Sequence, residues 1–87
     1  MKSRTTKSFW RQFDGLPEGV QKQAIRAYVM WRVDPWRQSL HFKCISEKHG
    51  VWSVRIGIHW RALGTRENSE MIWFWIGHHA EYDRLIG

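Results

Sequence analysis

The side chains best suited to chemistry in this sequence are arginines, histidines and a tyrosine, and the tightest group follows an apolar run near its end. Six apolar residues at 71–76 lead into Gly77, His78 and His79, with Tyr82 three residues later. Imidazole gives or takes a proton near neutral pH, and a phenol stacks on a base or donates a proton. The segment predicts acid–base groups at a strand end, although a buried strand followed by a polar turn has the same composition.

Two arginines lie in a segment of strict alternation upstream of that run. Between residues 52 and 62 the even positions are apolar and the odd positions are polar or glycine, which is the period of a half-buried strand. Gly57 divides the segment into two strands. A three-residue turn at Gly57 keeps Arg55 and Arg61 on one sheet face, whereas a two-residue turn places them on opposite faces.

The same parity gathers basic side chains on the sheet face away from the helices. Guanidinium groups hold phosphate through paired N–H donors and stabilise charge that grows on it, so such a face suits a phosphodiester substrate. An ordinary solvated sheet face also alternates, and from the pattern alone it is the more frequent case. The residues placed together are His41, Lys43, Arg55, His59 and Arg61, with His78 and His79 at the end of the adjoining strand.

The elements that position these residues are two helices followed by strands. Apolar residues at helical spacing follow Thr6, a good N-cap, and Pro17 begins a second helix that Asp34-Pro35 ends. We predict one α+β domain over residues 1–87, with an N-terminal α-hairpin on one face of a small, mainly antiparallel four-stranded sheet. The expected strands begin at about 38, 51, 60 and 71 and end at about 45, 56, 63 and 76. The sequence does not decide whether a short initial strand forms at 3–6 or a last helix at 80–86.

Composition limits the classes of protein to which the chain can belong. Eighty-seven residues make one domain, and seven tryptophans help so short a chain to bury a core. The net charge of +6 favours a polyanion or an acidic protein as partner. The single cysteine, Cys44, excludes an intrachain disulfide and fits a reducing compartment. No apolar stretch approaches the length of a membrane span. We expect a cytoplasmic protein that binds no membrane.

Metal and cofactor chemistry is not expected. His78, His79 and Cys44 are the nearest approach to a ligand set. Adjacent histidines normally point to different sides of a strand, and neither Cys-x-x-Cys nor His-x-x-x-His spacing is present. Glycine-rich phosphate loops are also missing from the sequence. We therefore expect no metal site and no cofactor.

Three segments carry a resemblance to a known family. They are the Leu-His-Phe-Lys run at 40–43, the hairpin at 51–64 and the Ile-Gly-His-His-Ala-Glu-Tyr-Asp run at 76–83. Together they resemble the RelE/ParE superfamily of bacterial toxins, and HigB-like members most of all. The resemblance implies a compact sheet with an α-hairpin and a cognate antitoxin as partner. It also implies ribosome-dependent cleavage of mRNA, without a metal, by attack of the ribose 2′-hydroxyl.

The resemblance implies roles for individual residues. Arg61 matches the arginine that closes the hairpin and stabilises the transition state, and Arg55 matches a basic residue that binds phosphate or assists as base. His79 matches the basic position after the last strand. Tyr82 matches the terminal tyrosine that stacks on a base or donates a proton. These four form the expected catalytic set. The expected RNA-binding residues are His41, Lys43, His59 and His78.

Two other functions remain open at the level of sequence. Many active members end in a His-Arg pair with the tyrosine at least four residues later, whereas here His79 takes the second position and Tyr82 follows after three. The ParE branch of the superfamily shares the fold but inhibits DNA gyrase. A non-enzymatic gyrase inhibitor and a catalytically inactive RNA-binding relative are therefore the alternatives to an endoribonuclease.

Overall fold

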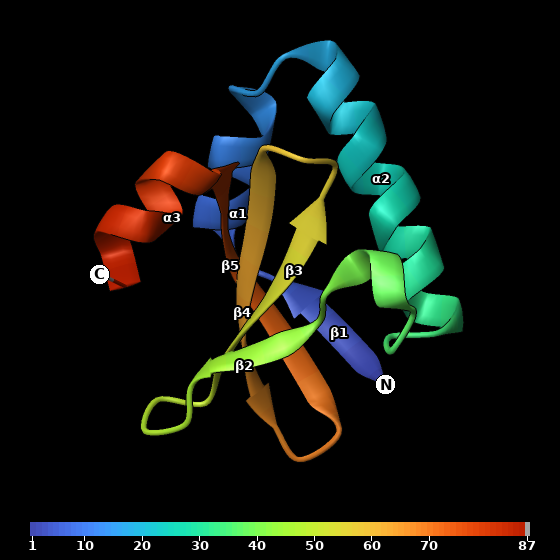
Figure 1. Ribbon diagram of the computed structural model, residues 1–87, viewed down its shortest axis with the longest axis vertical. Coiled ribbons are helices and arrows are strands. Elements are labelled where there is room, and N and C mark those ends of the chain that lie inside the picture. The colour runs from blue at the N-terminus through green and yellow to red at the C-terminus, as the bar shows by residue number, and fades with distance from the viewer. Residues whose placement is uncertain (87) are drawn as a thin grey trace.

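The computed structural model describes residues 1–86 and shows two layers, a twisted sheet and the helices that flank it (Figure 1). In Figure 1, α2 runs along one flank of the sheet and α3 lies on the other. The elements in chain order are β1 (Lys2–Thr5), α1 (Lys7–Asp14), α2 (Glu18–Val33), the 3-10 turn η1 (Gln38–Leu40), β2 (Lys43–Ser46), β3 (Val51–Ile56), β4 (Trp60–Glu67), β5 (Glu70–His78) and α3 (His79–Ile86).

The sheet has five strands in the order β1-β5-β4-β3-β2. Strand β1 pairs with β5 in parallel, and every other pair is antiparallel. The predicted α+β class is confirmed, but the predicted number of four strands is wrong because the residues 2–5 form an edge strand. Their polar side chains show no alternation, so the strand is fixed by main-chain pairing and by Arg4, whose Nε donates to Glu70 Oε1 at 2.7 Å.

Local signals determine the helices as the sequence predicts. The Thr6 side chain accepts a hydrogen bond from the Phe9 amide at 3.1 Å and so caps α1. Helix α2 follows Pro17 and ends before Pro35. Helix α1 is tied to the sheet by Gln12, whose Oε1 accepts the Ile76 amide at 3.0 Å. None of the helices in residues 1–86 is long and apolar enough to cross a membrane.

The core lies between the two leading helices and the even positions of the hairpin. Val54, Ile56 and Ala62 are at most 5% exposed, and Trp52 and Trp60 are partly buried against the same cluster. This confirms the predicted parity of the hairpin. The remaining members of the cluster are Ala24, Ala27, Trp31, Leu40, Phe42, Met71, Trp73 and Ile76.

Two strand boundaries differ from the prediction. The segment predicted to begin a strand at Gln38 forms η1 instead, and β2 begins only at Lys43, because His41 takes a left-handed conformation with φ of 46°. Strand β4 continues to Glu67 rather than ending at Leu63. The strand can be this long because a tight turn at Asn68 connects it to β5. Asn68 has φ of 57°, and asparagine tolerates positive φ.

Strand β5 is interior in the sheet, as its apolar run predicts, but it is not buried evenly. Met71, Trp73 and Ile76 are at most 4% exposed. The register with β4 shifts between Leu63 and Gly64, so that Leu63 pairs with Trp75 while Gly64 pairs with Trp73. This bulge changes the parity of β5, which explains why no single alternation runs through the strand.

Candidate active site

The turn between β3 and β4 places two arginines opposite each other. Ile56 pairs with Trp60, which leaves a three-residue turn that begins at Gly57 with φ of 59°. Arg55 then pairs directly with Arg61. The predicted three-residue turn and the shared face of the two arginines are both confirmed.

Backbone carbonyls hold the two guanidinium groups. Arg55 Nε donates to the Gly57 carbonyl at 2.9 Å, and Arg61 Nη1 donates to the Trp60 carbonyl at 2.8 Å. The His41 ring lies beside them, with Nε2 3.4 Å from Arg55 Nη1. Like charges that face each other across strands destabilise a sheet. A bound anion would remove this repulsion, so the pair is well arranged to hold a phosphate.

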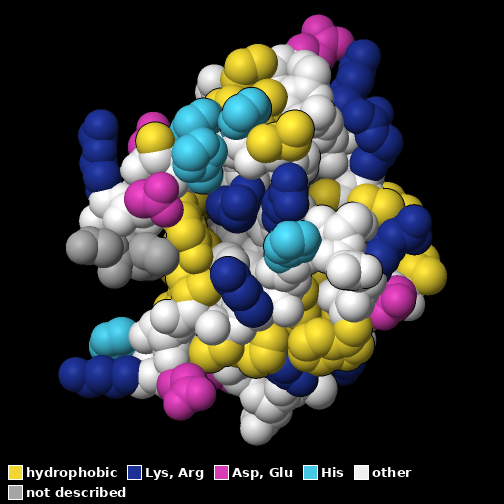
Figure 2. Space-filling model, viewed as in Figure 1, with side chains coloured by type: hydrophobic (Ala, Val, Ile, Leu, Met, Phe, Trp, Pro, Cys, Tyr) yellow, Lys and Arg dark blue, Asp and Glu magenta, His cyan; other side chains and the backbone are white. Residues whose placement is uncertain are grey.

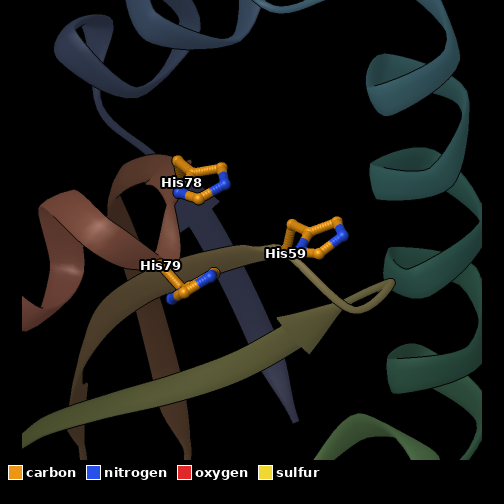
Figure 3. A group of neighbouring side chains, drawn as sticks. All are labelled: His59, His78 and His79. Atoms are coloured by element: carbon orange, nitrogen blue, oxygen red, sulfur yellow. The ribbon is translucent and has the colours of Figure 1, made fainter.

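Three histidines from two separate parts of the chain form a second group beside the arginines. His59 ends the β3–β4 turn, His78 ends β5 and His79 begins α3 (Figure 3). The His78 and His79 ring centroids are 4.5 Å apart, and the His59 centroid is 5.9 Å from the first and 6.0 Å from the second. The expectation that the adjacent histidines diverge is wrong, because the chain changes from strand to helix between them.

The main chain and two neighbours orient these rings. The His79 amide donates to the His59 carbonyl at 2.8 Å, which ties the turn to the start of α3. The Ala80 amide donates to His78 Nδ1 at 3.1 Å. Asp83 Oδ2 lies 3.7 Å from His79 Nδ1. Sequence reasoning missed Asp83 because the possible last helix was expected to begin at residue 80. In the structure α3 begins at His79, which puts Asp83 at i+4 from it.

The other predicted site residues lie at different depths. Lys43 is exposed and pairs with Ser53, two positions from Arg55, so it belongs to the same face. Tyr82 is only 9% exposed, which means that its ring is part of the packing beneath α3. The structure therefore brings the predicted residues into two groups and leaves Tyr82 largely covered. One group lies on the sheet face and consists of His41, Lys43, Arg55 and Arg61, and the other lies at the end of the hairpin and consists of His59, His78 and His79. Figure 2 shows Lys and Arg side chains at the middle of this face, with His side chains beside and above them.

An α-hairpin on a five-stranded sheet with an open basic face defines a small α+β domain. A family model described as the ParE-like toxin domain matches residues 18–84, so the chain belongs to that family and to the RelE/ParE superfamily of toxin–antitoxin toxins. The predicted resemblance is confirmed. No curated protein matches the sequence.

Solved structures show the same fold at low sequence identity. A chain of the RelB–RelE antitoxin–toxin complex from Methanococcus jannaschii has a TM-score of 0.74 at 14% identity, covering 95% of this chain and 98% of that one. The YoeB/ParE toxin from Agrobacterium tumefaciens has a TM-score of 0.70 at 16% identity over 91% and 99% of the two chains. A chain of the RelBE2 toxin–antitoxin complex from Mycobacterium tuberculosis has 0.69 at 20% identity over 88% of both.

Proposed function

We propose that this toxin is a metal-independent endoribonuclease that cleaves mRNA on the ribosome. The observation that carries the proposal is the facing pair Arg55 and Arg61. Arg61 also pairs with Gly77, two residues before His79, and the His79 amide donates to the turn that joins the strands of the two arginines. Two cations and an imidazole on a rigid support are the groups that an RNA phosphodiester needs for cleavage.

The proposed chemistry is the one that the resemblance to the RelE/ParE superfamily implies. The ribose 2′-hydroxyl attacks the adjacent phosphorus and loses its proton, the bond to the 5′-oxygen breaks, and that oxygen takes up a proton. Arg61 stabilises the charge that grows on the non-bridging oxygens. Arg55 holds the phosphate or assists as base, and His79 transfers a proton. The products are a 2′,3′-cyclic phosphate and a 5′-hydroxyl, and no water is consumed.

The remaining residues contribute to RNA binding in this proposal. His41, Lys43, His59 and His78 border the arginine pair and contact the phosphate backbone or stack on bases. Tyr82 is the member of the proposed catalytic set with the weakest structural support, since its ring is mostly buried. A base can stack on it only after α3 moves away from the sheet.

We also propose a cognate antitoxin as partner and the cytoplasm as the place of action. Two of the structures that share this fold are toxin–antitoxin complexes. The net charge of +6 suits an acidic, partly disordered segment that folds on the basic face when it binds. Such a segment covers Arg55 and Arg61 and so silences the toxin.

Inhibition of DNA gyrase without catalysis is the second candidate function. The family model that matches the chain is the ParE-like one, and the ParE branch acts on gyrase. The burial of Tyr82 also removes one expected catalytic group from ready access. A pure inhibitor needs no proton-transfer group, so the two candidates differ in what the substitution of site residues does.

Replacing Arg61 tests the nuclease against the inhibitor. If Arg61 stabilises charge that exists only in the transition state, Arg61→Ala slows cleavage by about 10²–10³-fold and leaves RNA or ribosome binding nearly intact. The measurement is primer extension on mRNA from cells that express each variant, with Arg37→Ala as a control in an exposed loop. Tyr82→Phe is expected to cost little, because the ring is packed inside the fold.

Primer extension on these cells, together with a supercoiling assay on purified gyrase, distinguishes the endoribonuclease from the gyrase inhibitor. Codon-phased cuts that disappear with Arg61→Ala support the nuclease. Intact messages together with inhibited supercoiling by purified gyrase would overturn it in favour of the second candidate. Cuts that persist unchanged in Arg61→Ala would show that the arginine pair is not the catalytic site.

A further inference from the structure

We propose that His59, His78 and His79 form a binding site for one divalent transition-metal ion, Zn²⁺ or Cu²⁺. One ring nitrogen of each histidine can be chosen so that the three nitrogens lie within 4.8 Å of one another (Figure 3). Nitrogens that share a tetrahedral zinc ion at about 2.0–2.1 Å lie roughly 3.4 Å apart. The rings therefore need to close by only about 1.4 Å at most, a movement that side-chain rotation supplies.

The backbone beneath the three histidines is already fixed. Trp60, the residue after His59, pairs with His78, and the His79 amide donates to the His59 carbonyl at 2.8 Å. These two links hold the three Cα positions in one arrangement with or without a ligand. The ion has to order side chains alone, which keeps the entropic cost of binding small.

A carboxylate stands where metal-binding histidines usually have one. Asp83 Oδ2 lies 3.7 Å from His79 Nδ1. This distance is longer than a hydrogen bond. Rotation of the Asp83 side chain would close the gap, and the carboxylate would then favour the tautomer that carries the proton on Nδ1 and leave the Nε2 lone pair for the metal. His78 must give up a contact, because its Nδ1 accepts the Ala80 amide at 3.1 Å and a neutral ring has a single lone pair. Metal binding therefore displaces that hydrogen bond.

The ligand chemistry selects the class of ion. Imidazole nitrogens suit Zn²⁺ and Cu²⁺, whereas Mg²⁺ and Ca²⁺ prefer oxygen ligands. Copper(II) binds nitrogen ligands more tightly than zinc, so both ions are expected to bind, with Cu²⁺ the stronger. Three protein ligands leave one position open to water or to a phosphate oxygen.

Occupancy of the site has a consequence that rests on the proposed nuclease function. An ion bound to His79 takes the lone pair that the proton transfer requires. Metal binding is then expected to inhibit RNA cleavage rather than to support it. The site would make the toxin sensitive to free zinc or copper.

The test is a titration of the full chain, without an affinity tag, by ZnCl₂ and separately by CuCl₂ and MgCl₂. Isothermal titration calorimetry and the imidazole signals in NMR should show one Zn²⁺ or Cu²⁺ per chain and no Mg²⁺. His59→Ala should weaken Zn²⁺ binding by at least about tenfold, since even indirect partners of metal ligands contribute 10–100-fold. His59 is exposed in a turn, so the variant keeps the fold. His49→Ala, in a different exposed turn, is the matched control.

Two outcomes would overturn the site: no binding of either transition metal, or equal affinity in wild type, His59→Ala and His49→Ala. Cleavage of ribosome-bound mRNA by the same samples tests the consequence, with a zinc-selective chelator that leaves Mg²⁺ on the ribosome and, separately, with one equivalent of Zn²⁺. Zinc should suppress cleavage by the wild type and His49→Ala at lower concentrations than cleavage by His59→Ala. A chelated wild type that cuts no ribosome-bound mRNA would refute the nuclease, and the binding data would still decide the metal site.

Discussion

Arg55 and Arg61 occupy positions that a sheet built for stability alone would not give to two cations. Facing like charges cost stability, and the carbonyls of Gly57 and Trp60 offset only part of that cost. An anion between the guanidinium groups removes the repulsion and gains charge-assisted hydrogen bonds at once. The arrangement of the pair is therefore the one that the proposed phosphate ligand would require.

Gly57 is the residue on which this geometry depends. Its φ of 59° is strained for any residue with a Cβ, and a Cβ there would lie 3.1 Å from Gln23 Oε1. Gly57→Ala should lower the free energy of unfolding by about 1–3 kcal/mol. It should also weaken cleavage, because the turn sets the pairing of Arg55 with Arg61.

Urea unfolding and primer extension on the same variant measure the two effects. Gly19→Ala is the control, since a Cβ at that helical position meets nothing within 4 Å. The control should be unchanged or more stable by up to about 1 kcal/mol. Equal stability of Gly57→Ala and wild type would show that the turn has another conformation in solution.

At the scale of elements, alternation was sufficient to predict the hairpin but not the whole sheet. The period from Trp52 to Ala62 fixes which face is buried, and a one-residue slip of the register would turn that face outward. Strand β1 was not predictable in the same way, because Lys2–Thr5 is a short polar edge strand that main-chain bonds hold in place. The end of β4 was missed because a single residue at positive φ, Asn68, replaced a longer turn.

The candidate site was predictable to a similar degree. The two arginines follow from parity, and both structure and prediction place them together. The histidine cluster does not follow from parity, because it depends on the change from strand to helix between His78 and His79. Burial of Tyr82 depends on how α3 packs on the sheet, and no local pattern reports that packing.

The bulge between β4 and β5 gives a prediction at this scale. A Cβ at Gly64 would lie 2.7 Å from Met71 Cε and 2.9 Å from the Ile72 carbonyl oxygen. Gly64→Ala should therefore force the two strands apart and destabilise the protein by about 1–3 kcal/mol. Thermal and urea unfolding measure the loss.

Gly15→Ala serves as the matched control for the bulge. Gly15 has φ of −82°, and a Cβ there makes only ordinary contacts at 3.6 Å or more. Its stability should stay within about 0.5 kcal/mol of the wild type. A Gly64→Ala variant as stable as this control would mean that the strands adjust their register freely at the bulge.

At the scale of the whole molecule, the excess of positive charge decides which partners the domain attracts. The net charge is +6 over 87 residues. In the proposed function, such a surface attracts both mRNA and an acidic antitoxin segment, and the two compete for the same basic face. Competition of this kind explains how one partner can silence the toxin without any change in its fold.

The last prediction locates the antitoxin on the basic sheet face. A complex held by exposed charges weakens as salt screens them, so the affinity for the protein encoded beside this gene should fall between about 50 and 500 mM salt. Lys43→Ala, on the face with Arg55, should weaken the complex and reduce its dependence on salt.

Lys22→Ala is the matched control, since Lys22 lies on α2 and pairs with Glu18 at 3.5 Å. Calorimetry at several salt concentrations measures both effects. A complex that responds to Lys22→Ala but not to Lys43→Ala would place the antitoxin over the α-hairpin instead, and a complex insensitive to salt would show that apolar contacts dominate.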